Sequence, residues 1–163
     1  MQRSYYIIEK PECNLVINKL PIWFKEVEFD GDEISGKMMF HSNNDYDENW
    51  GPDAKIEMSW EKKDRINFYH PREVQESINV YNAINVVVSN KKTIWIRSHE
   101  FTIWYGSRVK MIKKKYYVEN SIHGTFYCDL TERLFTLHST IIKVHYDGFE
   151  PYILECFNSI ICH

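Results

Sequence analysis

The 163-residue sequence lacks the features of several common protein classes. Only 6 glycines and 5 prolines exclude a collagen-like or low-complexity chain. No window approaches the ~20 uninterrupted apolar residues of a transmembrane helix. The first apolar run is interrupted by Glu9, Lys10 and Pro11 before it reaches the length of a secretory signal. We therefore expect a cytoplasmic protein with no membrane partner.

Recognisable catalytic and cofactor motifs are also missing. The sequence has no Gly-x-Ser-x-Gly, no Gly-x-Gly-x-x-Gly and no Gly-Lys-Ser/Thr phosphate loop, which disfavours common hydrolases and nucleotide-binding enzymes. We therefore predict no cofactor and no catalytic residues, and the sequence leans away from an enzyme.

Metal motifs are absent as well, since there is no Cys-x-x-Cys, His-x-His or His-Glu-x-x-His. The four cysteines are expected to be thiols in a reducing compartment. A metal site could in principle be formed by three thiolates and one imidazole, from Cys128, Cys156, Cys162 and His163. Structural zinc sites, however, usually take their ligands from pairs that are only a few residues apart in the sequence. Cys156 is explained more simply as a small core residue, so no metal ligand is predicted.

What the sequence does contain is ample material for a core. Apolar residues make up 44% and aromatic residues 15% of the chain, and the net charge is −3. Such a composition excludes disorder and gives no general attraction to nucleic acid or anionic membrane. Residues 1–163 are expected to form a single domain, because no linker or internal repeat interrupts them.

Hydrophobic periodicity predicts mainly strands. Apolar and polar residues alternate most clearly over 54–60, the pattern of a half-buried strand. Helical spacing of apolar residues predicts a helix at 71–85 and a second one at 151–162, each with a proline in its first turn. Short connections between the late strands favour antiparallel pairing. The predicted class is α+β: a largely antiparallel sheet with a mid-chain and a C-terminal helix packed on it.

Candidate ligand-binding residues come from polar side chains on apolar strand faces. Cys128 and Arg133 occupy such positions, and His99 shares its face with apolar neighbours. A buried arginine requires a carboxylate, a cluster of carbonyls or a ligand. If the three converge, with His123 nearby, they would form a small-ligand pocket or the site of an enzyme. The alternative is that they are satisfied core residues.

A basic segment offers a different function. The basic residues are Arg108, Lys110, Lys113, Lys114 and Lys115, and they lie beside Tyr105, Tyr116 and Tyr117. This combination is typical of single-stranded nucleic-acid binding. Lysines on an exposed strand also protect an edge against aggregation, and acidic segments elsewhere could neutralise the patch. Nucleic acid therefore remains an alternative partner.

The acidic run from Asp45 to Asn49 partly resembles a calcium-binding loop. Its sixth position is Trp50 instead of glycine, and its twelfth is Ile56 instead of glutamate. A solvated acidic loop is the preferred interpretation.

Three motifs carry a family resemblance: Ser-His99-Glu-Phe, then His123-Gly-Thr-Phe-Tyr-Cys128-x-x-Thr-x-Arg133-x-Phe-x-Leu, then Phe-Asn-Ser-Ile-Ile-Cys-His163. The sequence resembles a group of small uncharacterised archaeal proteins over roughly residues 85–163. The element order is similar to that of PsbP-like α/β/α sandwich domains. This resemblance implies a non-enzymatic partner-binding module and supplies no catalytic residues. Because the sequence also lacks a recognisable acid, base or nucleophile constellation, we expect a non-enzymatic binding or assembly module with a protein partner or self-association.

Overall fold

The computed structural model describes residues 5–42, 54–112, 114–142 and 146–163. The α+β class predicted above is wrong, because most of the described residues lie in strands and far fewer lie in helices. The described residues form two antiparallel sheets and only two α-helices. The sheet is larger than expected because three neighbouring strands are long and continuous: β6 Val87–Ile96, β7 His99–Ile112 and β8 Lys115–Cys128.

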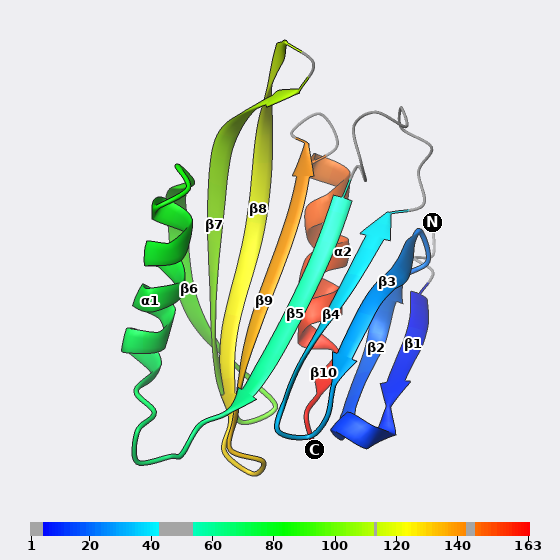
Figure 1. Ribbon diagram of the computed structural model, residues 1–163, viewed down its shortest axis with the longest axis vertical. Helices are drawn as coiled ribbons and strands as arrows, with labels where there is room; N and C mark the ends of the chain where they lie inside the picture. The colour runs from blue at the N-terminus through cyan, green and yellow to red at the C-terminus, as the bar shows by residue number, and fades with distance from the viewer. Residues whose placement is uncertain (1–4, 43–53, 113, 143–145) are drawn as a thin grey trace.

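The main sheet has seven strands, all antiparallel (Figure 1). Their spatial order is β3 Phe24–Gly31, β4 Ser35–Ser42, β5 Ala54–Lys62, β9 Arg133–Ile142, β8, β7 and β6. The smaller sheet contains β1 Tyr5–Lys10, β2 Leu15–Pro21 and the two-residue strand β10 Ile160–Ile161, and the short 3-10 helix η1 Pro11–Cys13 connects β1 to β2. The chain therefore returns at its end to a strand formed near its beginning.

The hairpin of β7 and β8 is longer than its local sequence favours. Glycine and polar residues near Gly106 and around 119–121 favour turns, yet both strands continue through these positions. Gly106 is needed because a Cβ there would lie 2.5 Å from Val86 Cγ1. The turn between the strands places Lys114 at a φ of 66°, in the left-handed region.

The two helices differ from the predicted ranges mainly in the second. α1 His70–Asn82 has Pro71 in its first turn, as expected for a residue without a backbone N–H. α2 Tyr146–Asn158 begins before Pro151, which lies inside the helix, and it ends before the predicted 162. Residues 160–161 are extended and pair with Ile17 and Val16 of β2. None of the described helices combines the length and apolar character that crossing a membrane requires.

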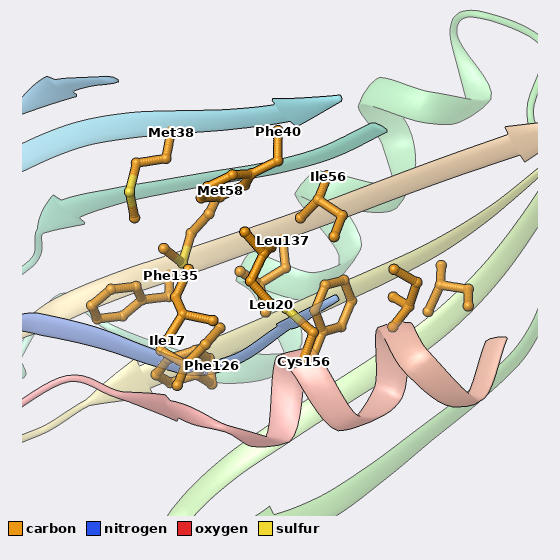
Figure 2. Close-up of a cluster of buried hydrophobic side chains, with 14 of the residues drawn as sticks. Ile17, Leu20, Met38, Phe40, Ile56, Met58, Phe126, Phe135, Leu137 and Cys156 are labelled. Atoms are coloured by element: carbon orange, nitrogen blue, oxygen red, sulfur yellow. The ribbon is translucent and has the colours of Figure 1, made fainter. Parts of the chain in front are cut away.

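The hydrophobic core lies between one face of the main sheet and a layer made by α2 and the small sheet (Figures 1 and 2). The alternation predicted for β5 is confirmed, because Ala54, Ile56, Met58 and Trp60 are each 2% exposed. α1 covers part of the opposite face, where Val74 and Ile78 pack on Trp104. The proposed acidic loop, Asp45 to Asn49, falls outside the described residues.

Candidate metal centre

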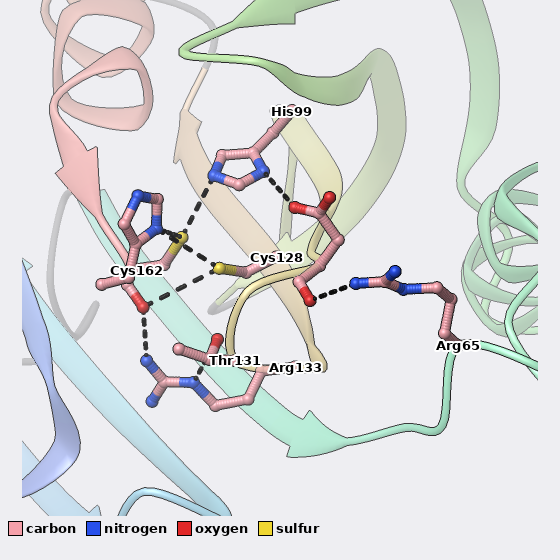
Figure 3. Close-up of polar contacts among 8 residues, drawn as sticks. Arg65, His99, Cys128, Thr131, Arg133 and Cys162 are labelled. Atoms are coloured by element: carbon pink, nitrogen blue, oxygen red, sulfur yellow. Dashed lines mark hydrogen bonds and ion pairs between the residues drawn. The ribbon is translucent and has the colours of Figure 1, made fainter.

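Four metal-binding side chains meet where the long strands end. His99 is the first residue of β7, Cys128 is the last of β8, and Cys162 and His163 follow β10. One potential ligand atom from each lies within 4.8 Å of all the others. His99, Cys128 and Cys162 are buried, whereas His163 is exposed. Figure 3 shows the imidazole of His99 and the two thiols pointing toward one another.

The spacing of these atoms is close to that of a tetrahedral metal site. Cys162 Sγ lies 3.3 Å from His99 Nε2 and 3.4 Å from His163 Nδ1, and Cys128 Sγ lies 3.5 Å from His163 Nδ1. With Zn–S bonds of ~2.3 Å and Zn–N bonds of ~2.0 Å, tetrahedral geometry separates sulfur from nitrogen by about 3.5 Å. Two thiolates and two imidazoles also form one of the usual ligand sets of structural zinc.

The outer nitrogen of the buried imidazole lies near a carboxylate but has no hydrogen-bond partner among the described residues. His99 Nε2 faces the thiol of Cys162, and His99 Nδ1 lies 3.9 Å from Asp129 Oδ1. The backbone of Asp129 is held by Arg65, whose Nη2 donates to its carbonyl oxygen at 2.8 Å (Figure 3). A carboxylate within hydrogen-bonding distance of a ligand histidine fixes the ring orientation and increases its basicity toward a metal, and Asp129 Oδ1 lies beyond that distance.

Arg133 is 1% exposed, and its requirement for a partner is met by carbonyl groups. Its Nη2 donates at 2.8 Å to the carbonyl oxygens of Cys162 and Asn14, and Nη1 donates to that of Cys13. Its Nε donates to Thr131 Oγ1 at 3.1 Å. Of the three predicted partners for this charge, the carbonyl cluster is therefore the one observed. Through Cys162 the guanidinium also fixes the backbone of a potential ligand.

The two thiols of the cluster differ in acidity. A hydrogen bond from Cys162 lowers the pKa of Cys128 to about 4. The same contact, together with burial, raises the pKa of Cys162. The other two cysteines are outside the cluster: Cys156 is buried in the core with a raised pKa of about 12, and Cys13 is buried at the end of η1. All four are free thiols.

Three of the four predicted ligand-binding residues come together, namely His99, Cys128 and Arg133 (Figure 3). His123 lies on the opposite face of β8 from Cys128, so it does not join them. Cys162 and His163 are not among the predicted ligand-binding residues, although the tail contains side chains that can bind a metal. The predicted helix through residue 162 concealed their position. The geometry gives reason to revise the prediction of no metal ligand.

His123 belongs to a second polar cluster. Its Nδ1 lies 2.7 Å from Nδ1 of His138, and its ring stacks on Trp104 with centroids 3.7 Å apart. Burial, together with the neighbouring imidazole of His138, lowers the pKa of His123 to about 2, and burial lowers the pKa of His138 to about 4. Both rings are therefore neutral in the folded protein at neutral pH. The titratable groups facing the pair are Tyr81 on α1, Lys55 and Glu57 on β5, Arg108 and Lys110 on β7 and Glu119 on β8.

This pair predicts acid sensitivity. Unfolded histidines bind protons below their ordinary pKa of 6.5, whereas the folded pair stays neutral down to about pH 4. Stability is thus fully present above pH 6.5 and decreases as the pH falls, by about 1.4 kcal/mol per histidine for each pH unit. Urea unfolding at pH 7.5, 6.5 and 5.5 should show this decrease. The slope should be clearly shallower for His138→Gln, and parallel slopes would contradict the assignment.

The basic segment is only partly available to a partner. Arg108 Nε lies 2.9 Å from the carboxylate of Glu119, and Lys110 Nζ lies 3.4 Å from it. These two positive charges therefore form ion pairs within the chain. Lys114 and Lys115 are exposed at the β7–β8 turn, and Lys113 lies outside the described residues. Nucleic-acid binding through this segment stays a prediction.

Comparisons with known proteins identify the fold but no activity. No protein-family model and no curated protein matches the chain. The PsbP protein (CyanoP) of Synechocystis sp. PCC 6803 has a TM-score of 0.62 at 10% identity, covering 100% of this chain and 95% of that one. A protein of Bacteroides thetaiotaomicron VPI-5482 has a TM-score of 0.58 at 16% identity over 98% of this chain. This chain spans about half of that protein, with 48% covered.

At such low identities the similarity concerns the fold alone. The predicted resemblance to PsbP-like domains is confirmed at that level. The resemblance to small archaeal proteins gains no support from these matches and stays a prediction.

Proposed function

We propose that the protein is a non-enzymatic binding or assembly module whose tail is fastened to the main sheet by a zinc ion. The ion is bound by His99, Cys128, Cys162 and His163. The observation that supports this most directly is the convergence of four ligand atoms within 4.8 Å from three segments of the chain. A reducing, cytoplasmic location belongs to the proposal, because the thiols must stay reduced to bind metal.

The ligand set favours a structural role over catalysis. Four protein ligands complete a tetrahedral shell, whereas catalytic zinc normally keeps one position for water or substrate. Thiolate and imidazole ligands also select zinc over magnesium or calcium, which prefer oxygen. A fixed tail would present a constant surface to a protein partner or a second copy of the chain.

Metal content is the direct test. Native mass spectrometry of the purified chain is expected to find one zinc ion per protein. Replacement by cobalt(II) should give the visible absorption of tetrahedral cobalt together with thiolate-to-cobalt charge transfer. Cys128→Ser and His99→Gln should each lose at least about tenfold in zinc affinity, since each removes one ligand.

Cys156→Ala is the matched control, because it removes a buried thiol that is not part of the cluster. It should keep one zinc ion per chain. Absence of zinc from the wild-type protein after zinc supplementation would disprove the proposal, as would equal zinc content in Cys128→Ser. His163→Gln tests whether all four ligands come from the protein. The spectrum of its cobalt form should indicate three protein ligands and one water in place of four protein ligands.

A further inference from the structure

The face of the main sheet that is turned toward α1 is unusually polar. Cross-strand neighbours place Glu57, His138, His123 and Trp104 in one row across β5, β9, β8 and β7. A sheet face under a helix normally carries apolar side chains, and the opposite face of these same strands does so. The row is on the other side of the sheet from the proposed zinc ligands, so it is a separate feature.

A pocket of about 150 Å³ opens at this row. Tyr81 of α1 and His138 of β9 line it together with Arg108, Glu119 and Lys55. The ring of Tyr81 lies 4.4 Å from that of His123 and 4.7 Å from that of His138, measured between centroids. The helix and the sheet therefore form the pocket jointly.

Buried polar atoms without partners lie in the strand rows beside the pocket. His123 Nε2, Trp104 Nε1 and Ser121 Oγ are all inaccessible to solvent and have no hydrogen-bond partner among the described residues. Ser121 lies opposite Thr140, another residue that lines the pocket. Buried polar groups are nearly always satisfied by protein, water or ligand, because an unmade hydrogen bond costs about 1–3 kcal/mol.

The charges around the pocket leave one positive charge in excess. Its lining contains Lys55, Arg108 and Lys110 but only the carboxylates of Glu57 and Glu119. Glu119 serves both Arg108 and Lys110. Within the described part of the chain, Lys55 forms no ion pair with a carboxylate. The neutral His123–His138 pair adds hydrogen-bonding capacity without adding charge.

We infer that this pocket binds a small oxyanion with a single negative charge, a carboxylate of a few heavy atoms. Arg108 and Lys55 supply the attraction, since charge-assisted hydrogen bonds from such groups to carboxylates are the stronger ones. Tyr81 and His138 supply further hydrogen bonds and define the size of the ligand. The volume is well below the ~300–1,000 Å³ of pockets for drug-sized ligands, so larger organic anions are excluded.

The test uses NMR titration of the full-length, zinc-supplemented protein with three probes: acetate, its neutral analogue acetamide, and inorganic phosphate. Acetate is expected to shift the ring resonances of His138 and His123 along a saturable curve in the millimolar range. Acetamide should cause little change. Phosphate binding more tightly than acetate at pH 7.5 would contradict the assignment of a singly charged ligand.

Two variants make the outcome specific. Arg108→Gln and Lys55→Gln should each weaken acetate binding about tenfold, as expected for the loss of one charge-assisted contact. Because Lys55 forms no ion pair with a described carboxylate, Lys55→Gln removes its positive charge without breaking an ion pair among the described residues. Weaker acetate binding by this variant therefore cannot be attributed to a lost ion pair. Lys91→Gln, an exposed lysine of β6, is the control and should leave affinity unchanged.

Linear shifts that do not saturate, or equal shifts with acetamide, would overturn the inference. So would saturable binding that both Arg108→Gln and Lys55→Gln leave unaffected. None of these results depends on the zinc proposal, because the proposed zinc ligands lie on the opposite face of the sheet from this pocket.

Discussion

Chelation of the metal is expected to lower the thermal unfolding midpoint of the protein by about 10 °C. A ligand that binds only the native state at a concentration of ~1,000 times its Kd contributes about 4 kcal/mol, and 1 kcal/mol corresponds to ~2–4 °C for a domain of this size. The effect should be large because the ion joins the start of β7, the end of β8 and the tail, segments that are remote in sequence. Thermal unfolding followed by circular dichroism, with zinc or with excess chelator, measures it.

The change should be reversible and specific. Adding zinc back should restore the midpoint, whereas magnesium should not, because it prefers oxygen ligands. Cys128→Ser is expected to unfold at the lower temperature with or without chelator, and Cys156→Ala should respond to chelator as the wild type does. A midpoint that chelator changes by less than about 1 °C would show that no structural metal contributes to the fold.

Replacing Arg133 by methionine is expected to reduce the free energy of unfolding by about 3 kcal/mol. Methionine fills much of the volume but cannot donate hydrogen bonds, so the carbonyl oxygens of Cys13, Asn14 and Cys162 would lose their donor. Each buried acceptor left unsatisfied costs about 1–3 kcal/mol, offset in part because the charge no longer has to be buried. Urea unfolding at pH 7.5 measures the difference.

Arg65→Met is the matched control, because Arg65 also donates to a carbonyl, that of Asp129, but is exposed. It should change stability by less than about 0.5 kcal/mol. A similarly small effect of Arg133→Met would contradict a structural role and would return Arg133 to the candidates for ligand binding. Zinc affinity gives a second readout: Arg133→Met should weaken it about tenfold, since the guanidinium positions Cys162.

Local pattern was sufficient for several elements of the fold. The alternation over 54–60 predicted a half-buried strand, and β5 has that burial. The polar residues on apolar faces were also informative, because Arg133, Cys128 and His99 do meet. In these cases neighbouring residues along the chain already decide which side of a strand is buried.

The remainder depended on contacts that no local pattern contains. Apolar spacing of three to four residues continues from Ile153 to Ile161, so periodicity alone extends the second helix to its end. Pairing of Ile160 and Ile161 with β2 stops the helix earlier and brings Cys162 beside Cys128. The ligands come from positions 99, 128 and 162–163, so they lack the tight spacing that identifies zinc sites in a sequence.

The fold class was missed for a related reason. Glycine and polar residues near 106 and 120 indicate turns when taken alone. In the protein these positions form cross-strand pairs, Gly106 with Ser121 and Ser107 with Asn120, inside one long hairpin. Pairing with a partner strand overrides local preference, which is more context-dependent for strands than for helices.

The pairing of β10 with β2 has a consequence for biosynthesis. Lys19 and Asn18 of β2 bond to Ser159, a residue about 140 positions later in the chain. On the ribosome, Leu15 and Ile17 therefore emerge long before the segment that completes their sheet has been translated. Contacts of such long range slow folding and leave apolar surface exposed in the nascent chain. Chaperones that hold unfinished chains are thus expected to engage the first strands until translation has passed residue 163.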